Sequence, residues 1–393
     1  MSKTIEHLAF SSSSDIANTE TAALDAEIRE LARQCKMPSA NIELDYQTEP
    51  SFFSALAQYG EQHDLVLIKP ESFAGLAGMG VRSIRRSYLG GQPANIGYLH
   101  HLRFHPDIRG GSFLARGYKA FRQIFNAQPL VTTLTSILED NINARKLLEN
   151  DRATGYMPRY QPISRFMTAL IPLSGPGNRW PIKYRSMRED LPCQIRTLQE
   201  SDLPDLLKLF DESGKYNDGA PRFFADDFSG SHTNTLPGLK ITDMVGVFHQ
   251  NELLAAIGIW NQQHYRQIVL LQLCKSLRSL SNLWQLGSNI WGKCPIPAPG
   301  NPVNVVLLDP WCIKPGMEAE LMPMLIKAAV REAQKRGALF AALGITEKNP
   351  AIKALRSVFF ISYWSIIYQV FWPETGSYEF GRKQMQIANL GAL

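Results

Sequence analysis

The sequence predicts a mixed α/β protein in which a mostly antiparallel sheet is flanked by helices, and in which this unit occurs as two tandem copies. Strand-like and helix-like hydrophobic patterns alternate along the chain. The 393 residues exceed the roughly 100–200 residues of one domain, so two domains are expected. The predicted element order in residues 193–393 also repeats that of residues 1–172, although few residues match.

The first half contains the clearer patterns. Leu24, Ile28 and Leu31 have helical spacing, and Gly90-Gly91 marks a turn between two strands. The predicted elements are, in order, helices 21–35 and 50–59, strands 65–69, 73–87 and 95–105, a helix ending near 127, strand 130–138, helix 141–150 and strand 164–171. We expect residues 1–172 to form an N-terminal domain.

Residues 173–192 break every periodicity with prolines, glycines and basic residues, which is typical of a linker. Residues 193–393 are expected to form the C-terminal domain. Its predicted elements are strand 194–197, helix 201–213, strands 244–250, 252–262 and 303–313, helix 317–336, strand 338–345, helix 349–356 and strand 362–371. The aromatic run in the last of these predicts a buried strand.

Composition excludes several classes of protein. Hydrophobic residues make up 45% and charged residues 20% of the chain, and no apolar run approaches the ~20 residues of a membrane span. The N-terminus lacks the pattern of a secretion signal. The five cysteines include no C-x-x-C pair, and the net charge of +5 is too low for a typical nucleic-acid binder. We therefore expect a cytoplasmic protein that contacts neither membrane nor nucleic acid.

One strand-turn-helix stretch is chemically informative. The strand stops at Pro106, turns through Arg109-Gly110-Gly111, and is followed by a helix with an apolar stripe. No acidic residue occurs between Ile108 and Leu138. A helix start with free N–H groups, positive potential and no carboxylate favours an anion. The alternative is a plain glycine loop capped by Ser112.

This stretch resembles the Gcn5-related N-acetyltransferase superfamily, in which a strand ends in an apolar-x-apolar-x-Pro pattern before an Arg/Gln-x-x-Gly-x-Gly/Ala loop. LRFHPDIRGGSFL matches through Leu102, Phe104, Pro106, Arg109 and Gly110, and departs at Ser112 and Leu114. EDNINARKLLEN is similar to the superfamily's Asn-x-x-Ala helix through Asn141 and Ala144.

The resemblance implies the acyl-CoA N-acyltransferase fold in two tandem copies, with acetyl-CoA as co-substrate and an unidentified amine as acceptor. The loop would bind the pyrophosphate of coenzyme A, and the end of the strand would hydrogen-bond the pantetheine arm. The residues expected to bind the cofactor are Leu102, Arg103, Phe104, Arg109, Gly110, Gly111, Ser112, Phe113 and Asn141.

The histidines on the strand raise the question of a metal. Regular alternation would place His100 on one face and His101 with His105 on the other. His101 and His105 would then be about 13 Å apart at ~3.3 Å per residue. One ion cannot collect them, so no metal is expected.

For catalysis, HHLRFHPDIR is similar to the arylalkylamine-acetyltransferase version of the motif, which implies His100 as the base. The alternative is a hydrogen-bonded core histidine. The superfamily often carries a tyrosine acid seven residues after the helix asparagine, where this chain has Leu148. We expect Tyr156, or else Tyr160, to protonate the leaving thiolate. The alternatives are that solvent protonates it and that both tyrosines belong to the core or its rim.

The corresponding turn in the second half lacks an arginine and begins its helix with Glu318 and Glu320, which would repel a pyrophosphate. This copy is expected to have lost its coenzyme site. The leading hypothesis is an acetyl-CoA-dependent N-acetyltransferase. A non-catalytic acyl-CoA-binding protein and an aminoacyl-tRNA-dependent transferase are the alternatives.

Overall fold

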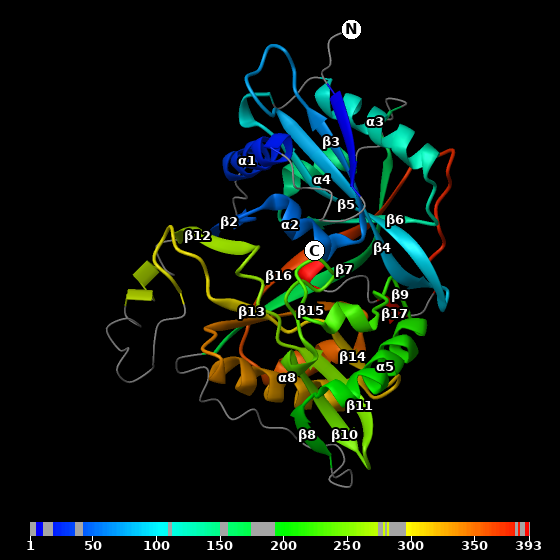
Figure 1. The fold of residues 1–393 in the computed structure, drawn as a ribbon, viewed down its shortest axis with the longest axis vertical. Coiled ribbons are helices and arrows are strands. Elements are labelled where there is room, and N and C mark those ends of the chain that lie inside the picture. Colours follow the sequence, from blue (N-terminus) through cyan, green and yellow to red (C-terminus); the bar gives the residue numbers. More distant parts are fainter. Residues whose placement is uncertain are drawn as a thin grey trace.

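The computed structural model describes residues 5–10, 19–35, 42–108, 112–149, 156–173, 193–273, 278–279, 281–282, 296–381, 384–385 and 390–392. It confirms the mixed α/β class: a nine-stranded, mostly antiparallel sheet and a four-stranded sheet are flanked by helices (Figure 1). Residues 174–192 of the predicted linker lie outside the described residues, so the domain boundaries stay a prediction.

The first half follows the predicted order closely. Its elements are β1 (Ile5–Phe10), α1 (Thr19–Gln34), β2 (Ile42–Gln47), α2 (Phe52–Leu56), β3 (Gln62–Ile68), β4 (Gly78–Leu89), β5 (Gln92–Phe104), α3 (Phe113–Ala127), β6 (Thr133–Leu138), α4 (Ile142–Leu148) and β7 (Arg159–Pro172). Gly90 and Gly91, with φ of 58° and 80°, make the β4–β5 turn as predicted. Strands β1 and β2 were not predicted.

In the second half two predictions were wrong. Its elements are β8 (Gln194–Thr197), α5 (Leu203–Lys215), β9 (Asn217–Asp218), β10 (Met244–His249), β11 (Glu252–Gly258), β12 (Gln267–Leu273), β13 (Val305–Leu307), β14 (Trp311–Ile313), α8 (Glu318–Lys335), β15 (Phe340–Thr346), β16 (Ile361–Phe371) and β17 (Gln384–Met385). The strand expected at 303–313 is divided into β13 and β14, since Pro310 between them has no N–H for a ladder. The helix expected at 349–356 is a 3₁₀ helix, Pro350–Ser357.

The two halves exchange strands β7 and β16. The large sheet has the order β1-β3-β4-β5-β6-β16-β7-β15-β13, so β16 lies between β6 and β7 of the first half. Strand β7 in turn pairs with β15 of the second half. The smaller sheet has the order β14-β11-β10-β8, and β2 pairs with β12 across the halves. The aromatic β16 is therefore an interior strand, as its sequence predicted.

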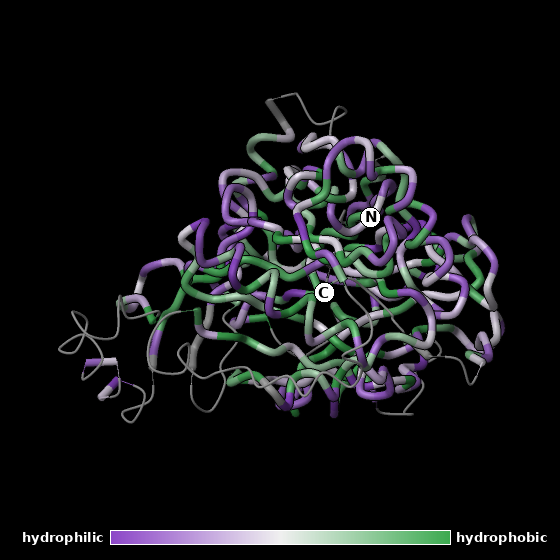
Figure 2. The backbone as a smooth tube through the Cα atoms, turned by 90° about the horizontal axis from the view of Figure 1, so that it is seen from below, coloured by the Kyte–Doolittle hydropathy of each residue, from purple (hydrophilic) through white to green (hydrophobic). Residues whose placement is uncertain are grey.

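Helix α3 is fixed to the sheet by packing and by a hydrogen bond from the buried Arg82, which also forms an ion pair within the sheet. Its stripe of Tyr118, Phe121 and Phe125 is buried, and Figure 2 shows hydrophobic stretches crossing the middle of the molecule. Arg82 of β4 is fully buried and donates to Asp64 Oδ2 from Nε and Nη2 at 2.9 and 2.8 Å. Its Nη1 donates to the carbonyl of Gln128 after α3, at 3.1 Å.

This ion pair provides the first prediction. Replacing Asp64 with alanine leaves the Arg82 guanidinium buried without its counter-charge, which should lower the free energy of unfolding by about 3–5 kcal/mol. Urea unfolding followed by circular dichroism measures this change. Glu252→Ala, which removes the partner of Lys314 from an exposed pair, is the control and should hardly move the midpoint. Equal effects of the two substitutions would contradict the assignment.

Candidate functional site

Strands β5 and β6 separate soon after they meet. Their parallel pairing consists of Gly97 with Thr133 and Tyr98 with Leu134. Beyond this point a cavity of about 410 Å³ opens, lined by residues 99–103 of β5 and 135–138 of β6. Beyond Tyr98 the backbone of β5 on the side of β6 is therefore no longer paired with β6. An extended ligand could form backbone hydrogen bonds there, as an additional strand would.

Both halves contribute to the cavity, and most of the side chains that line it are apolar or aromatic. The first half supplies Tyr46, Tyr59, Tyr98, Leu102, Tyr118, Phe121, Ile137, Leu148 and Tyr160, and the second half supplies Ile268, Leu270, Val303, Leu307, Phe340, Ile361, Tyr363 and Leu390. A concave, mostly apolar cavity with a few polar groups is typical of a small-molecule site.

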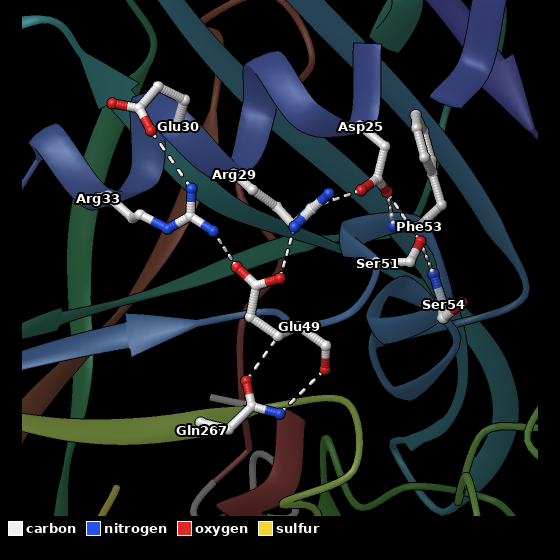
Figure 3. Close-up of polar contacts among 9 residues, drawn as sticks. All are labelled: Asp25, Arg29, Glu30, Arg33, Glu49, Ser51, Phe53, Ser54 and Gln267. Atoms are coloured by element: carbon white, nitrogen blue, oxygen red, sulfur yellow. Dashed lines mark hydrogen bonds and ion pairs between the residues drawn. The ribbon is translucent and has the colours of Figure 1, made fainter. Parts of the chain in front are cut away.

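A polar network follows directly after the cavity-lining residues 46–48 (Figure 3). Arg29 of α1 donates to Asp25 Oδ2 at 2.7 Å and to Glu49 Oε2 at 2.5 Å. The side-chain amide of Gln267, in β12, accepts from the backbone N–H of Glu49 at 3.0 Å and donates to its carbonyl at 2.9 Å. The network joins α1, the segment after β2 and the second half, so residues 46–48 lie in a fixed position at the cavity.

The predicted alternation of β5 is wrong after His100. His101 has φ of 52°, and the pairing of β5 with β4 shifts register there. This β-bulge places His101 beside His100, with their Nδ1 atoms 2.5 Å apart. Leu102 lies instead on the α3 side, next to Phe121 and Gly80. The expectation that His100 and His101 face opposite sides does not hold.

His100 belongs to a chain of hydrogen bonds across three strands. Its Nε2 lies 2.7 Å from Ser83 Oγ in β4, and Ser83 Oγ lies 2.7 Å from His63 Nδ1 in β3. The ring of His100 stacks on Tyr59 with centroids 4.1 Å apart. His63 and Ser83 were not identified from the sequence. The chain runs His63, Ser83, His100, His101, and at its cavity end the Nε2 of His101 has no hydrogen bond within the described residues.

The environment keeps these imidazoles neutral. Burial, followed by the neighbouring His101, holds the pKa of His100 well below 6.5. Burial and the guanidinium groups of Arg103 and Arg266 lower the pKa of His101 to about 3, and burial lowers that of His63 to about 4. Their unprotonated ring nitrogens can accept a proton and the hydrogen-bonded chain can pass it on, although a pKa of about 3 makes His101 a weak base.

The predicted cofactor residues fall into three groups. Arg109, Gly110 and Gly111 lie outside the described residues. Leu102, Arg103 and Asn141 line the cavity, and the Asn141 side chain caps α4 by accepting from Ala144 N at 3.2 Å. The remaining predicted residues, Phe104, Ser112 and Phe113, are outside its lining.

The start of α3 lacks the side chains that would compete with a bound anion. Ser112 is its N-cap residue but makes no capping hydrogen bond with its side chain, and the first turn has no acidic residue. Side-chain capping by Ser112, which the plain-loop alternative required, is absent. Helix α8 of the second half does begin with Glu318 and Glu320, as expected.

Of the two tyrosines considered as acids, only Tyr160 lines the cavity. Its hydroxyl hydrogen-bonds that of Tyr118, and burial raises the pKa of both groups. Tyr156 is 46% exposed and lies with Lys119 Nζ 5.4 Å from its ring centre, away from the cavity lining.

Two further observations concern the described parts of the chain as a whole. None of their helices is both long and apolar enough to cross a membrane. They also contain no cluster of three or more histidine, cysteine or acidic side chains placed to hold a metal ion.

Comparisons with known proteins show the fold. No protein-family profile and no curated protein sequence matches the chain. Among solved structures, Saccharomyces cerevisiae N-myristoyltransferase with bound myristoyl-CoA superposes with a TM-score of 0.57 at 12% identity, over 95% of this chain and 80% of that one. The same enzyme with myristoyl-CoA and inhibitors gives 0.57 at 12% identity, over 100% and 87%. The chain has the acyl-CoA N-acyltransferase fold.

The two-copy form of this fold, expected from the repeated element order, fits the exchange of β7 and β16 between the halves. A GCN5-related N-acetyltransferase from Sphaerobacter thermophilus also matches, with a TM-score of 0.43 at 11% identity over 78% of this chain and 79% of that one. At that score the similarity does not establish a common arrangement.

The histidine chain gives the second prediction. Since the pKa of His100 lies well below 6.5 and that of His101 is about 3, both rings should stay neutral as pH falls from 8 to 5.5. Selective histidine labelling and NMR titration measure this, with His100→Gln and His101→Gln variants to assign the signals. A midpoint at or above 6.5 for His100 would contradict the buried chain.

Proposed function

We propose that the chain is an N-acyltransferase that moves an acyl group from a coenzyme A thioester to an amine. The observation that carries this proposal is the separation of β5 and β6 beyond Tyr98, which opens an apolar cavity beside a free strand edge. The fold it shares with an N-myristoyltransferase that binds myristoyl-CoA supports the choice of donor.

The donor would bind with its pyrophosphate at residues 109–113 and its pantetheine arm along β5. The first turn of α3 has no carboxylate to compete with phosphate, and its N–H groups carry positive potential. The two amide groups of a pantetheine arm can form hydrogen bonds with the backbone of residues 99–104, as a neighbouring strand would. Asn141 lines the same cavity.

In the reaction, the amine nitrogen attacks the thioester carbonyl, the new C–N bond forms, and the C–S bond then breaks to release the thiolate. Backbone N–H groups at the bulge of β5 are the candidates for stabilising the oxyanion. The amine proton passes to His101 Nε2, and the chain through His100 and Ser83 spreads the positive charge towards His63. His100 thus acts as base through its neighbour.

The thiolate takes up a proton from a tyrosine or from water. Tyr156 was the first choice from the sequence, and Tyr160 is the better-placed of the two because it lines the cavity. Burial raises the pKa of Tyr160, so this residue keeps its proton at neutral pH and is a weaker acid than the thiol that would form, which leaves water as the competing proton donor.

The acyl group expected from the sequence is acetyl. The cavity of about 410 Å³ is larger than an acetyl group fills, and the similar yeast enzyme was solved with a myristoyl thioester. We propose acetyl-CoA as the donor and include myristoyl-CoA in every assay, since the comparison of the two defines the acyl length.

The third prediction concerns donor binding. Calorimetry should detect acetyl-CoA or myristoyl-CoA at tens of micromolar, and Arg109→Glu should abolish this binding because it sets a carboxylate against the pyrophosphate. Arg356→Glu makes the same charge change on the 3₁₀ helix of the second half and should leave binding unchanged. Failure of the unmodified protein to bind either thioester would end the proposal.

The fourth prediction separates an enzyme from a binding protein. Thiol release from the bound thioester should increase when a panel of amines is added. His100→Gln should lower kcat by roughly 10²-fold or more, the usual contribution of a general base, while calorimetry shows unchanged thioester affinity. Release that no amine stimulates would instead favour the non-catalytic acyl-CoA-binding protein.

A further inference from the structure

The charges at the cavity are all of one sign. Among the described residues that line it, Arg103 and Arg266 are the ionised side chains at neutral pH, and none is an aspartate or a glutamate. His100 and His101 add no positive charge because burial keeps them neutral. The cavity is therefore apolar over most of its surface, with a positive region beside the two histidines.

Arg103 has an incomplete set of partners. Its Nη1 donates to the carbonyl of Cys35 at 2.9 Å, whereas its Nε is buried without a hydrogen-bond partner. Asp45, an acidic residue that acts electrostatically on Arg103, accepts a hydrogen bond from Gln47 Nε2 at 2.7 Å. Within the described residues Arg103 forms no ion pair. A buried guanidinium that lacks a counter-charge and a partner for its Nε–H is unfavourable unless a carboxylate or phosphate supplies both.

Arg266 approaches the same region from the second half. It lies in the turn before β12, where its Nη1 donates to the carbonyl of Gly391 at 2.9 Å and its guanidinium lies over the ring of Tyr46 at 5.9 Å. Both guanidinium groups act on the pKa of His101 and on that of Tyr46. The two arginines thus converge on the residues next to the proposed proton path.

We propose that the amine acceptor is a small molecule that carries a carboxylate, such as an α-amino acid, and that Arg103 and Arg266 bind this carboxylate. This inference rests on the proposed N-acyltransferase function and specifies its second substrate. A carboxylate there neutralises the Arg103 guanidinium and accepts charge-assisted hydrogen bonds from it. The amine of the same molecule is then directed at His101. A diamine would instead bring a second positive charge to two arginines, without a carboxylate in the described lining to balance it.

The experiment compares acceptors that differ only in this charge. Thiol release from the better of acetyl-CoA and myristoyl-CoA is measured with glycine, leucine, phenylalanine and glutamate, with the amides of their α-carboxyl groups, and with putrescine. The best amino acid should have a kcat/KM at least tenfold above that of its amide, and putrescine should be the poorest. The amides have the larger fraction of unprotonated amine at neutral pH, so the comparison is biased against the expected result.

Variants at Arg103 test the residue assignment. Arg103→Gln should bring the acid-to-amide ratio of kcat/KM close to one, whereas Arg103→Lys, which keeps the charge, should retain most of the preference. Each ratio is measured within one variant, so a partial loss of folded protein cancels. Arg356→Gln, an exposed arginine of the second half, is the control and should leave the ratio as in the unmodified protein.

The outcomes separate the two proposals. If neither thioester binds, or no amine stimulates release, the N-acyltransferase function is wrong and the acceptor inference falls with it. If release occurs equally well with amides or putrescine, the enzyme stands and the carboxylate acceptor is overturned. If the preference is present but survives in Arg103→Gln, the assignment of Arg103 is overturned.

Discussion

The site depends on the short pairing of β5 with β6. The two strands can meet at Gly97 because this residue has no side chain: a Cβ there would lie 2.4 Å from Thr133 Oγ1. Beyond Tyr98 each strand follows a different partner, β5 with β4 and β6 with β16. The opening is thus built into the register of the large sheet, and the cavity exists without any movement of a loop.

The strand exchange explains why the cavity has walls from both halves. Because β16 lies between β6 and β7, and β7 pairs with β15, the large sheet is continuous across the molecule. The pair β2–β12 and the network around Arg29 and Glu49 close the opposite side. The site lies where the two halves meet. The first half carries the predicted donor motif, and the corresponding helix of the second half begins with two glutamates.

Much of the fold could be predicted from sequence because its signals are local. The helical stripes of α1 and α3, the Gly90-Gly91 turn and the carboxylate-free start of α3 all depend on neighbouring residues. The bulge at His101 could not be predicted, since its positive φ depends on the register with β4. The part played by His63, Ser83 and Arg266 needs contacts between elements far apart in the sequence. Pro310 was a usable signal for the break between β13 and β14.

The most direct test of this account is a crystal structure of the protein with an unreactive acyl-CoA thioether. The account predicts that the pantetheine arm lies between β5 and β6 and hydrogen-bonds the backbone of residues 99–104, with the pyrophosphate at the start of α3. The acyl carbon next to sulfur should then lie near the β-bulge at His101. Density for the ligand at any other place, with the opening between β5 and β6 left unoccupied, would contradict it.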